Sequence, residues 1–520
     1  MRYHGTQTPI TMRNLALSLA AAATAMTGHL CAARQASNFN ITASEARAHD
    51  CGSECQRILG LTNPADLDIV GHDFDFDFYD TAANFSGSQP GDVLKLKPMN
   101  PEEEGRTFRA GTAAFKFQYT TVGLDGKTVP ATGFIAFPFS ANMGPDGASA
   151  SKDGASKHNG TYKLVAWAHG TIGLFAGCAP SNGPDMFDYN SWQALTTRGY
   201  AVVATDYAGL GNNATMHKYC SFDSHATDVY YSVVAARKLF GGALSREWVS
   251  VGHSQGGGTA WKLAESEFVR HDEGYLGTVA LSPATYVVDM LLGGMSKGGN
   301  SSSGSRGGKD DIDRNVIKYP GYLPYLPLAV ERANPAFHST LLSPTMQKRV
   351  QLGKAKQLCT NALMGLTFDL YANKGPLVNT SGGLAHDTPY MLDWQARHAP
   401  ALGARSPAPV LVVQGLNDTS VLAPTTEHAW NASCGYGNAV HLSEYPGVEH
   451  SPLPATAEAE WMGWIDWRFA GGRYADGKCS RVTRRAPFGG NWTKTPPEFR
   501  LPKFLGGGGG GNKSSTADEL

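Results

Sequence analysis

One pentapeptide of the chain has the residue types and the spacing of a serine nucleophile. Gly252-His253-Ser254-Gln255-Gly256 matches the pattern G-x-S-x-G. This pattern presents a reactive serine where a strand precedes it and a helix follows, because the sharp turn between them exposes the serine oxygen. The strand-like run 247–251 leads into Ser254, and residues 259–264 begin a helix-like segment. The context therefore favours a nucleophile over a glycine-rich structural turn.

A serine hydroxyl is a weak nucleophile at neutral pH and needs a base, usually histidine, that a carboxylate orients. Where the serine sits on a strand-to-helix turn, the acid and then the base follow it in the chain. Asp418 follows the apolar, strand-like run 411–413 in a glycine-containing loop. That would place its carboxylate at the carboxyl end of a strand, beside the crevice where such sheets bind ligands. We expect Asp418 to be the acid; the alternative is an aspartate that caps a turn.

Sixteen histidines compete for the role of base. His450 follows the last strand-like run, 441–444, and precedes the last predicted helix. His441 lies inside that run and His386 precedes Asp418, so neither matches the expected chain order. His450 therefore completes the predicted catalytic triad.

The tetrahedral intermediate of acyl transfer needs hydrogen-bond donors for its oxyanion. One donor is expected from the backbone N–H of Gln255, the residue after the nucleophile, and another from the loop 169–173 after an earlier strand. In that loop Gly170 permits close approach, and Thr171 adds a hydroxyl donor. His253 belongs to the sharp turn that carries Ser254 (the elbow), and His169 belongs to this loop. Because both histidines are explained in this way, we predict no metal site and no cofactor.

These residues require a framework in which several strands end at a common edge. Strand-like runs lie at 163–168, 200–206, 248–252, 278–281, 410–413 and 441–444, and helix-like spacing at 223–240 and 455–469. This alternation predicts an α/β fold with a mostly parallel, twisted sheet and helices on both faces. Together with the elbow it indicates the α/β-hydrolase fold. Two further runs within 115–138 predict a hairpin, and alternating Asp and Phe over 72–80 predict a half-buried strand.

The pattern changes after Pro283, where a low-complexity piece and a Tyr/Pro/Leu-rich run interrupt the core until about residue 407. We interpret this stretch as an insertion rather than as a second fold. The expected organisation is a signal peptide at 1–33, an N-terminal extension at 34–110, the first part of the hydrolase core at 111–283, a cap between nucleophile and acid at 284–407, the second part of the core at 408–475, a C-terminal extension at 476–504 and a glycine-rich tail at 505–520.

The start of the chain has the three regions of a secretory signal peptide. Arg2 and Arg13 precede the apolar run 15–26, and small residues follow at 31–33; a signal anchor is the alternative. The last four residues, 517–520, read Ala-Asp-Glu-Leu and differ in their first position from the K/H-D-E-L retention signals. The sequence thus predicts the secretory pathway, with plain secretion and receptor-mediated retention in the endoplasmic reticulum lumen as equal alternatives.

The composition is that of a globular protein with a large core. The chain has 520 residues, 42% of them hydrophobic, and its net charge of −1 argues against a nucleic-acid partner. The cysteines beyond the signal peptide lack zinc-ligand spacing, so we expect disulfides with one thiol left over, and a local bridge between Cys51 and Cys55. Sequons for N-glycosylation agree with this compartment: Asn40, Asn84, Asn159, Asn213, Asn300, Asn379, Asn431 and Asn491.

Several short segments form a specific combination: His169-Gly170-Thr171, Cys178-Ala179-Pro180-Ser181, Arg198-Gly199-Tyr200, Asp206-Tyr207-Ala208-Gly209-Leu210-Gly211 and the elbow 252–256. Together they resemble the fungal secretory lipases of the lipase A-like family, from about Gly91 to about Phe469. The chain departs from the family at three points. Its elbow is closer to that of general esterases, its loop carries Thr171 where better-known lipases of the family have an acidic residue, and the low-complexity piece and the terminal D-E-L are extra.

The resemblance implies an α/β-hydrolase core with a cap, hydrolysis of carboxylic esters (commonly triacylglycerols), and the disulfides Cys178–Cys359 and Cys434–Cys479. We therefore expect a serine ester hydrolase, a lipase or esterase of the secretory pathway that acts through an acyl-enzyme. Its expected partners are a small ester or lipid substrate and, transiently, a lipid surface. The alternatives are another serine hydrolase of this fold, such as an aminopeptidase or an aryl or feruloyl-type esterase, and a catalytically dead, hydrolase-like binding protein.

Overall fold

The structure is a computed structural model that describes residues 40–100, 102, 105–142, 162–296, 320–474 and 478–485. The predicted signal peptide, the low-complexity piece of the insertion and the C-terminal tail lie outside these residues, as do the sequons at Asn159, Asn300 and Asn491.

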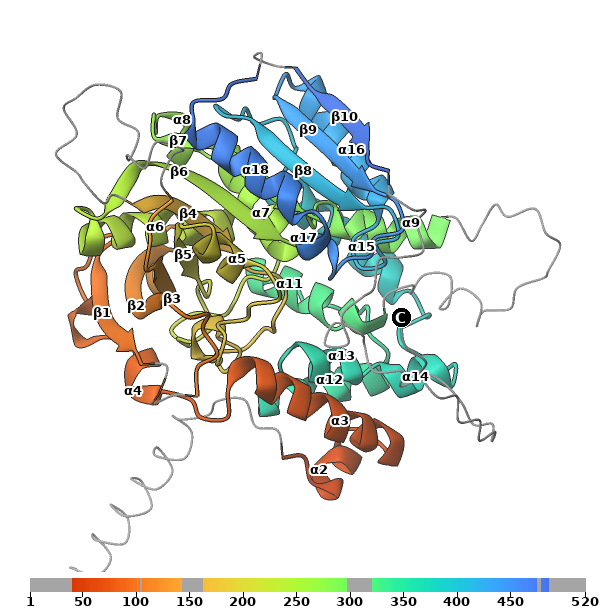
Figure 1. The fold of residues 1–520 in the computed structure, drawn as a ribbon. Helices are drawn as coiled ribbons and strands as arrows, with labels where there is room; N and C mark the ends of the chain where they lie inside the picture. Colours follow the sequence, from red (N-terminus) through yellow and green to blue (C-terminus); the bar gives the residue numbers. More distant parts are fainter. Residues whose placement is uncertain are drawn as a thin grey trace, which may run out of the picture.

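The described strands form one ten-stranded sheet (Figure 1). In chain order they are β1 (Val93–Met99), β2 (Thr112–Val122), β3 (Thr128–Pro138), β4 (Tyr162–Ala168), β5 (Ala201–Thr205), β6 (Leu244–His253), β7 (Tyr275–Leu281), β8 (Val410–Gly415), β9 (Val440–Tyr445) and β10 (Ser480–Thr483). In space the order is β1-β2-β3-β5-β4-β6-β7-β8-β9-β10. Pairing is antiparallel from β1 through β5 and parallel from β5 through β10. The predicted hairpin and the mostly parallel sheet are confirmed.

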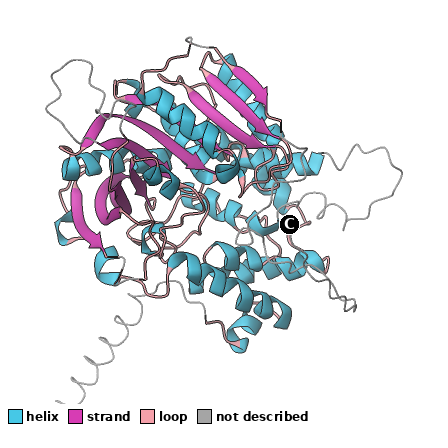
Figure 2. Cartoon of the chain, in the orientation of Figure 1, coloured by secondary structure: helices cyan, strands magenta, loops and turns pink. Residues whose placement is uncertain are grey.

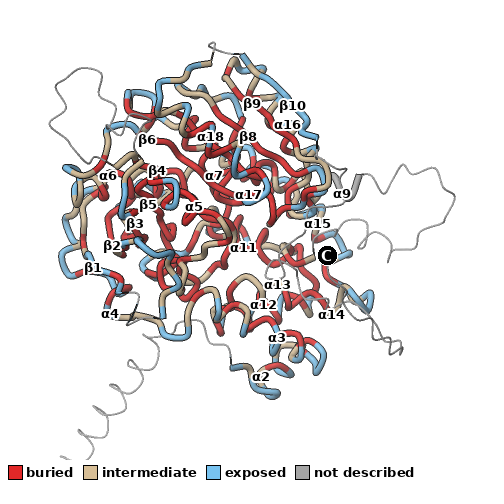
Figure 3. The backbone as a smooth tube through the Cα atoms, in the orientation of Figure 1, coloured by how far each residue is buried: buried red, intermediate tan, exposed pale blue. Residues whose placement is uncertain are grey.

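Helices cover both faces of this sheet (Figure 2). One face packs against α6 (Phe222–Phe240) and α7 (Gln255–Ala264), and the other against α5 (Trp192–Thr197) and α18 (Glu458–Phe469). Neighbouring residues of β4 serve the two layers, since Ala166 belongs to the first cluster and Trp167 to the second. All residues of β5 and β8 are buried (Figure 3), which is why these strands read as continuous apolar runs in the sequence.

The segment between β7 and β8 is helical, and its described residues, 284–296 and 320–407, are called the insertion below. Its helices are α9 (Val287–Ser296), α11 (Tyr325–Ala333), α12 (Pro344–Lys356), α13 (Thr360–Gly365), α14 (Phe368–Ala372) and α15 (Gly383–His398). Their apolar side chains form a cluster that also contains buried residues of α2 (Ala43–Ala48) and α3 (Ser53–Val70). The N-terminal helices thus pack against the insertion, beside α12, α13 and α14 in Figure 1.

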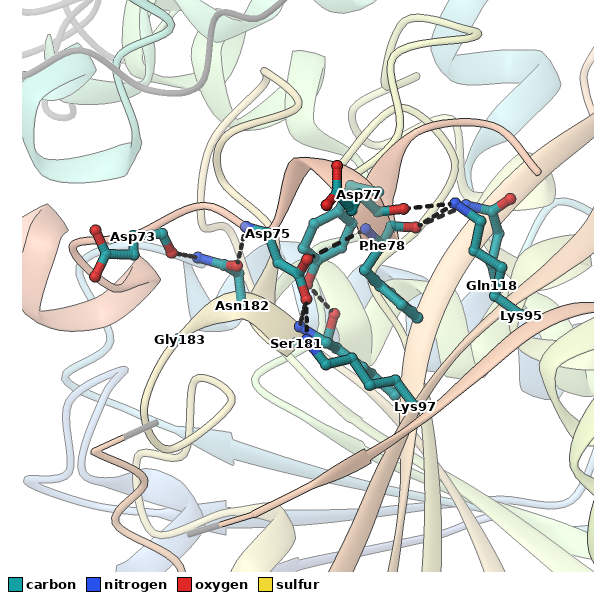
Figure 4. Close-up of polar contacts among 12 residues, drawn as sticks. Asp73, Asp75, Asp77, Phe78, Lys95, Lys97, Gln118, Ser181, Asn182 and Gly183 are labelled. Carbon is teal, nitrogen blue, oxygen red and sulfur yellow. Dashed lines mark hydrogen bonds and ion pairs between the residues drawn. The ribbon is translucent and has the colours of Figure 1, made fainter. Parts of the chain in front are cut away.

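The run 72–80 does not form the predicted strand. Residues Phe76–Tyr79 form the short helix α4, and the Asp75 carboxylate accepts a hydrogen bond from a backbone N–H of its first turn at 3.2 Å. The same carboxylate pairs with Lys97 at 2.7 Å (Figure 4). It also pairs with the buried Lys116 at 2.8 Å. The alternation therefore reflects a capped turn held by ion pairs, because an aspartate side chain can satisfy nearby N–H groups that a strand would leave to its neighbour.

Three disulfide bonds join cysteines of the described residues: Cys51–Cys55, Cys178–Cys359 and Cys434–Cys479, with Cα–Cα distances of 5.1, 5.6 and 6.0 Å. Two of these are the pairs that the resemblance implies, and the third is the expected local bridge. Cys220 is a buried free thiol. Among the described helices, none combines the length and the apolar character needed to cross a bilayer.

Candidate active site

Ser254 occupies a sharp turn between β6 and α7. Its backbone angles, φ 59° and ψ −121°, lie in a region that a residue with a side chain rarely adopts. Two glycines make the turn sterically feasible. A Cβ on Gly252 would lie 2.1 Å from the carbonyl oxygen of Gly256, and a Cβ on Gly256 would lie 1.9 Å from that of Ala168. The strand, the strained turn and the helix of a nucleophile elbow are therefore all present.

Asp418 and His450 are in direct contact beyond the carboxyl ends of β8 and β9. Nδ1 of His450 donates a hydrogen bond to Oδ2 of Asp418 at 2.7 Å. The other carboxylate oxygen accepts from the backbone N–H groups of Ser420 at 2.8 Å and Val421 at 2.7 Å. The side-chain amide of Gln414 donates to Oδ2 at 3.3 Å. Both oxygens of the carboxylate are thus held, and one of them is aimed at the imidazole.

Burial and pairing act in opposite directions on the pKa of Asp418. Burial of the carboxyl raises the pKa, whereas the charge and the hydrogen bond of His450 and the N–H of Val421 lower it, and the net pKa lies below its ordinary value. Asp418 is therefore ionised at neutral pH and accepts the Nδ1 proton. Burial, with the neighbouring charge of His450, lowers the pKa of His253 to about 3, so that ring is neutral.

The residue before the nucleophile links the elbow to this pair. Nε2 of His253 lies 3.1 Å from the carbonyl oxygen of His450, and the two imidazole centroids are 4.6 Å apart. The structure thus brings the elbow, Asp418 and His450 together at one edge of the sheet. Within the described part of the chain Ser254 Oγ makes no hydrogen bond to His450, and contacts between catalytic groups are often long before substrate binds.

The loop after β4 lies against Ser254, since a Cβ on Gly170 would come within 3.4 Å of the Cβ of Ser254. The N–H of Gly170 donates to the hydroxyl of Tyr189 at 3.3 Å, so this donor is already engaged. The carbonyl oxygen of Gly170 lies 2.7 Å from Nδ1 of His169. Because a trans peptide is planar, that contact turns the N–H of Thr171 to the opposite side. The N–H of Gly170 is thus engaged with Tyr189, whereas the N–H of Thr171 has no hydrogen-bond partner among the described residues.

Thr171 and Gln255 line the same pocket as Ser254. The N–H of Gln255 stands at the first position of α7, where helix geometry leaves donors unpaired and the helix dipole is positive. The hydroxyl of Thr171 lies 2.9 Å from that of Tyr219, and either of the two can donate. The site thus holds two backbone donors and a hydroxyl pair beside the candidate nucleophile.

A pocket that is partly open to solvent extends from Ser254 into the insertion. Its lining is mostly apolar and aromatic: Tyr219, Ala284, Val287, Met290, Leu291, Tyr322, Leu323, Tyr325, Leu326, Trp394 and Val421, with Thr171, Ser254, Gln255 and Ser420. Such a lining, with a few polar groups that include Ser254, fits a ligand that has one polar centre and an apolar substituent.

The loop after β4 is tied to the insertion. The N–H of Thr360 donates to the carbonyl oxygen of Ile172 at 2.9 Å, and Gly173 forms an isolated antiparallel bridge with Cys359. The disulfide Cys178–Cys359 closes the same region covalently. The position of the loop, and hence of its donor, depends on this part of the insertion.

Two residues that hold the site were not identified from the sequence. Tyr189 lies in a loop where Met186, Phe187 and Asn190 all have positive φ. Gly183-Pro184 predicts a turn there, but it does not predict that the tyrosine reaches Gly170. Gln414 could have been identified, because a polar residue at the end of a buried apolar strand usually makes a specific hydrogen bond, here to Asp418.

No family model matches the sequence, and no curated protein matches it. Solved structures do share its fold. Candida antarctica lipase A is 15% identical, with a TM-score of 0.55, over 82% of this chain and 93% of that one. The rice cell wall degrading esterase LipA from Xanthomonas oryzae is 18% identical, with a TM-score of 0.52, over 73% of this chain and 98% of that one. These likenesses confirm the predicted α/β-hydrolase fold.

Proposed function

We propose that the chain is a serine carboxylic-ester hydrolase, a lipase or esterase that works through an acyl-enzyme. In this proposal Ser254 is the nucleophile, His450 the base and Asp418 the acid. The observation that carries it is the 2.7 Å contact between Asp418 and His450 beside a serine on a strained elbow. A catalytic triad is recognised by such geometry and by the order of roles, not by sequence position alone.

In the first half-reaction Nε2 of His450 takes the hydroxyl proton of Ser254 while Oγ attacks the ester carbonyl carbon. Asp418 keeps the proton on Nδ1, so that Nε2 carries a lone pair, and it stabilises the imidazolium that forms. The bond to the alcohol then breaks as His450 protonates the departing oxygen, and the acyl group stays on Ser254. A water molecule, deprotonated by His450, attacks this ester and releases the carboxylic acid.

The negative charge that develops on the carbonyl oxygen is stabilised by the N–H groups of Gln255 and Thr171, with the hydroxyl of Thr171 as a third donor backed by Tyr219. Gly170 supplies the close approach of the loop. Fixed donors aimed at the developing charge act strongly where protein groups replace water around it, and the loss of one typically reduces kcat by about 10²–10³-fold.

The substrates that we propose are esters with an apolar acyl group. The pocket that begins at Ser254 has a mostly apolar wall, and the proteins of similar fold include a lipase and an esterase. Transient contact with a lipid surface would follow for a triacylglycerol substrate. The three disulfides fit an oxidising compartment. We therefore propose the secretory pathway, as a secreted protein or one retained in the endoplasmic reticulum lumen by a receptor for residues 517–520.

Hydrolysis of p-nitrophenyl esters from acetyl to palmitoyl, with Ser254→Ala alongside, tests the proposal. Turnover and labelling by a fluorophosphonate are both expected, and both disappear in the variant. A preference for long chains supports the lipase form, and turnover confined to acetyl or butyryl esters supports a short-chain esterase. Folded wild-type protein that neither turns over an ester nor takes up the label would refute the proposal, and cleavage of aminoacyl amides instead would indicate a peptidase.

A further inference from the structure

Two buried histidines hold the side chain of Gln255. Its amide nitrogen lies 3.3 Å from Nε2 of His217 and 3.3 Å from Nε2 of His225. His225 belongs to α6, and His217 to the loop that leads into this helix. All three residues are buried: Gln255 is 1% exposed, His217 0% and His225 1%. The residue after the candidate nucleophile is therefore anchored, through its side chain, on a neighbouring helix and loop.

The amide and the two rings are chemically matched. An amide offers either two N–H donors on one atom or two lone pairs on the other, so it can satisfy two imidazole nitrogens in either orientation. Each ring turns Nε2 to the amide, and Nδ1 of His225 has no hydrogen-bond partner among the described residues. Burial lowers the pKa of His225 to about 3 and that of His217 well below its usual value, so both rings are neutral.

Stacking fixes the two rings in turn. The planes of His217 and His225 are inclined by 16°, with centroids 4.8 Å apart. The ring of Tyr207 packs on His225 at 4.5 Å, and its hydroxyl donates to the backbone carbonyl of His169 at 3.1 Å. The stack therefore runs from the side chain of Gln255 to the loop after β4, the two segments that supply the candidate oxyanion donors. In a close-packed interior such rings do not turn without displacing their neighbours.

We propose that His217 and His225 are positioning residues: their hydrogen bonds to the Gln255 side-chain amide orient the backbone N–H of Gln255 toward the oxyanion. This inference rests on the proposed esterase function. The N–H belongs to the peptide that follows the strained angles of Ser254, so relaxation of that strain would rotate the donor. A side chain anchored on the same residue opposes the rotation. Because the donor acts on charge that appears in the transition state, these hydrogen bonds affect kcat and leave substrate binding alone.

Three substitutions at His225 separate this role from simple packing. His225→Gln places an amide where Nε2 lies, His225→Asn is a similar polar side chain that is too short to reach Gln255, and His225→Leu has no polar atom. We expect His225→Asn and His225→Leu to lower kcat for p-nitrophenyl butyrate by about 10–100-fold with little change in KM. A trifluoromethyl ketone, which forms an oxyanion with the serine, should bind more weakly by the same factor. His225→Gln should stay within about threefold of the wild type in both measurements.

Gln255→Met gives an independent readout, because it removes the amide but keeps the backbone N–H. It breaks the contacts to both rings, so we expect at least the loss of kcat and of ketone affinity found for His225→Leu. No further loss is expected when the two changes are combined, since Gln255→Met has already broken the contact to His225. Wild-type kcat and ketone affinity in His225→Asn, or equal impairment of His225→Gln and His225→Asn, would overturn the inference alone. That comparison decides the matter even if His225→Leu does not fold. An inactive, unlabelled wild type would overturn the proposed function as well.

Discussion

Replacement of Asp418 by asparagine changes one atom of the acid, and the contacts around it determine the outcome. One carboxylate oxygen accepts two backbone N–H groups, from Ser420 at 2.8 Å and Val421 at 2.7 Å, and these donors cannot be reversed. The asparagine oxygen must therefore take that side. Its NH2 group then faces His450, 2.7 Å away in the native contact. Nδ1 of His450 becomes an acceptor, the ring proton moves to Nε2, and the imidazole can no longer take a proton from Ser254.

We expect Asp418→Asn to lower kcat by about 10⁴-fold, which corresponds to roughly 5 kcal/mol of transition-state stabilisation. Substrate binding and the folded structure are expected to persist, because the asparagine still accepts from the two backbone donors. The assay is steady-state hydrolysis of a p-nitrophenyl ester, with thermal unfolding and the rate of fluorophosphonate labelling measured on the same protein. Retention of more than about a tenth of wild-type kcat would show that the Asp418–His450 contact does not set the tautomer, and the reasoning would fail.

Three further outcomes are expected. Tyr189→Phe removes the acceptor of the Gly170 N–H, so kcat should fall by about tenfold with KM unchanged in ester hydrolysis, whereas a change confined to KM would contradict the role given to the loop. Gly256→Ala places a Cβ 1.9 Å from a backbone oxygen and should reduce kcat by at least about 100-fold. The control, Gly463→Ala, is at a helix position with nothing within 4 Å; it should keep activity, and its free energy of unfolding in urea should rise by about 0.5–1 kcal/mol. Equal behaviour of the two variants would refute the steric argument. Burial raises the pKa of Glu265 from 4.5 to about 7, so the stability that this carboxyl contributes is complete below pH 4.5 and is lost as the pH rises through about 7. The free energy of unfolding of Glu265→Gln should therefore rise by up to about 3 kcal/mol relative to that of the wild type over that interval. A constant difference between the two proteins from pH 4.5 to pH 8 would contradict this.

The sequence allowed the elbow and the order of the proposed triad to be predicted because both depend on local patterns. A buried strand, a glycine-rich turn and a helix start surround Ser254, and they leave a recognisable signature of residue types. Asp418 and His450 each follow a strand of the same parallel sheet, and parallel strands end at one edge. Chain order then suffices to predict which aspartate and which histidine meet there.

The parts that could not be predicted depend on packing between segments that are distant in the chain. Tyr189 reaches Gly170 from a loop whose left-handed residues are not glycines, and His217 and His225 meet Gln255 only because α6 packs beside α7. The run 72–80 was predicted wrongly for a related reason. The Asp75 carboxylate satisfies a local N–H group and two lysines on neighbouring strands, and an alternation of residue types does not reveal these contacts.

The bond between Cys178 and Cys359 gives the proposed enzyme a built-in dependence on where it matures. It fastens the oxyanion loop to the insertion next to the 2.9 Å hydrogen bond between Thr360 and Ile172. A newly made chain in a reducing cytosol lacks this bond, and its loop is then held by far weaker contacts. Catalytic competence would thus depend on oxidation of this cysteine pair, so that the redox state of the surroundings acts on the proposed site through the loop.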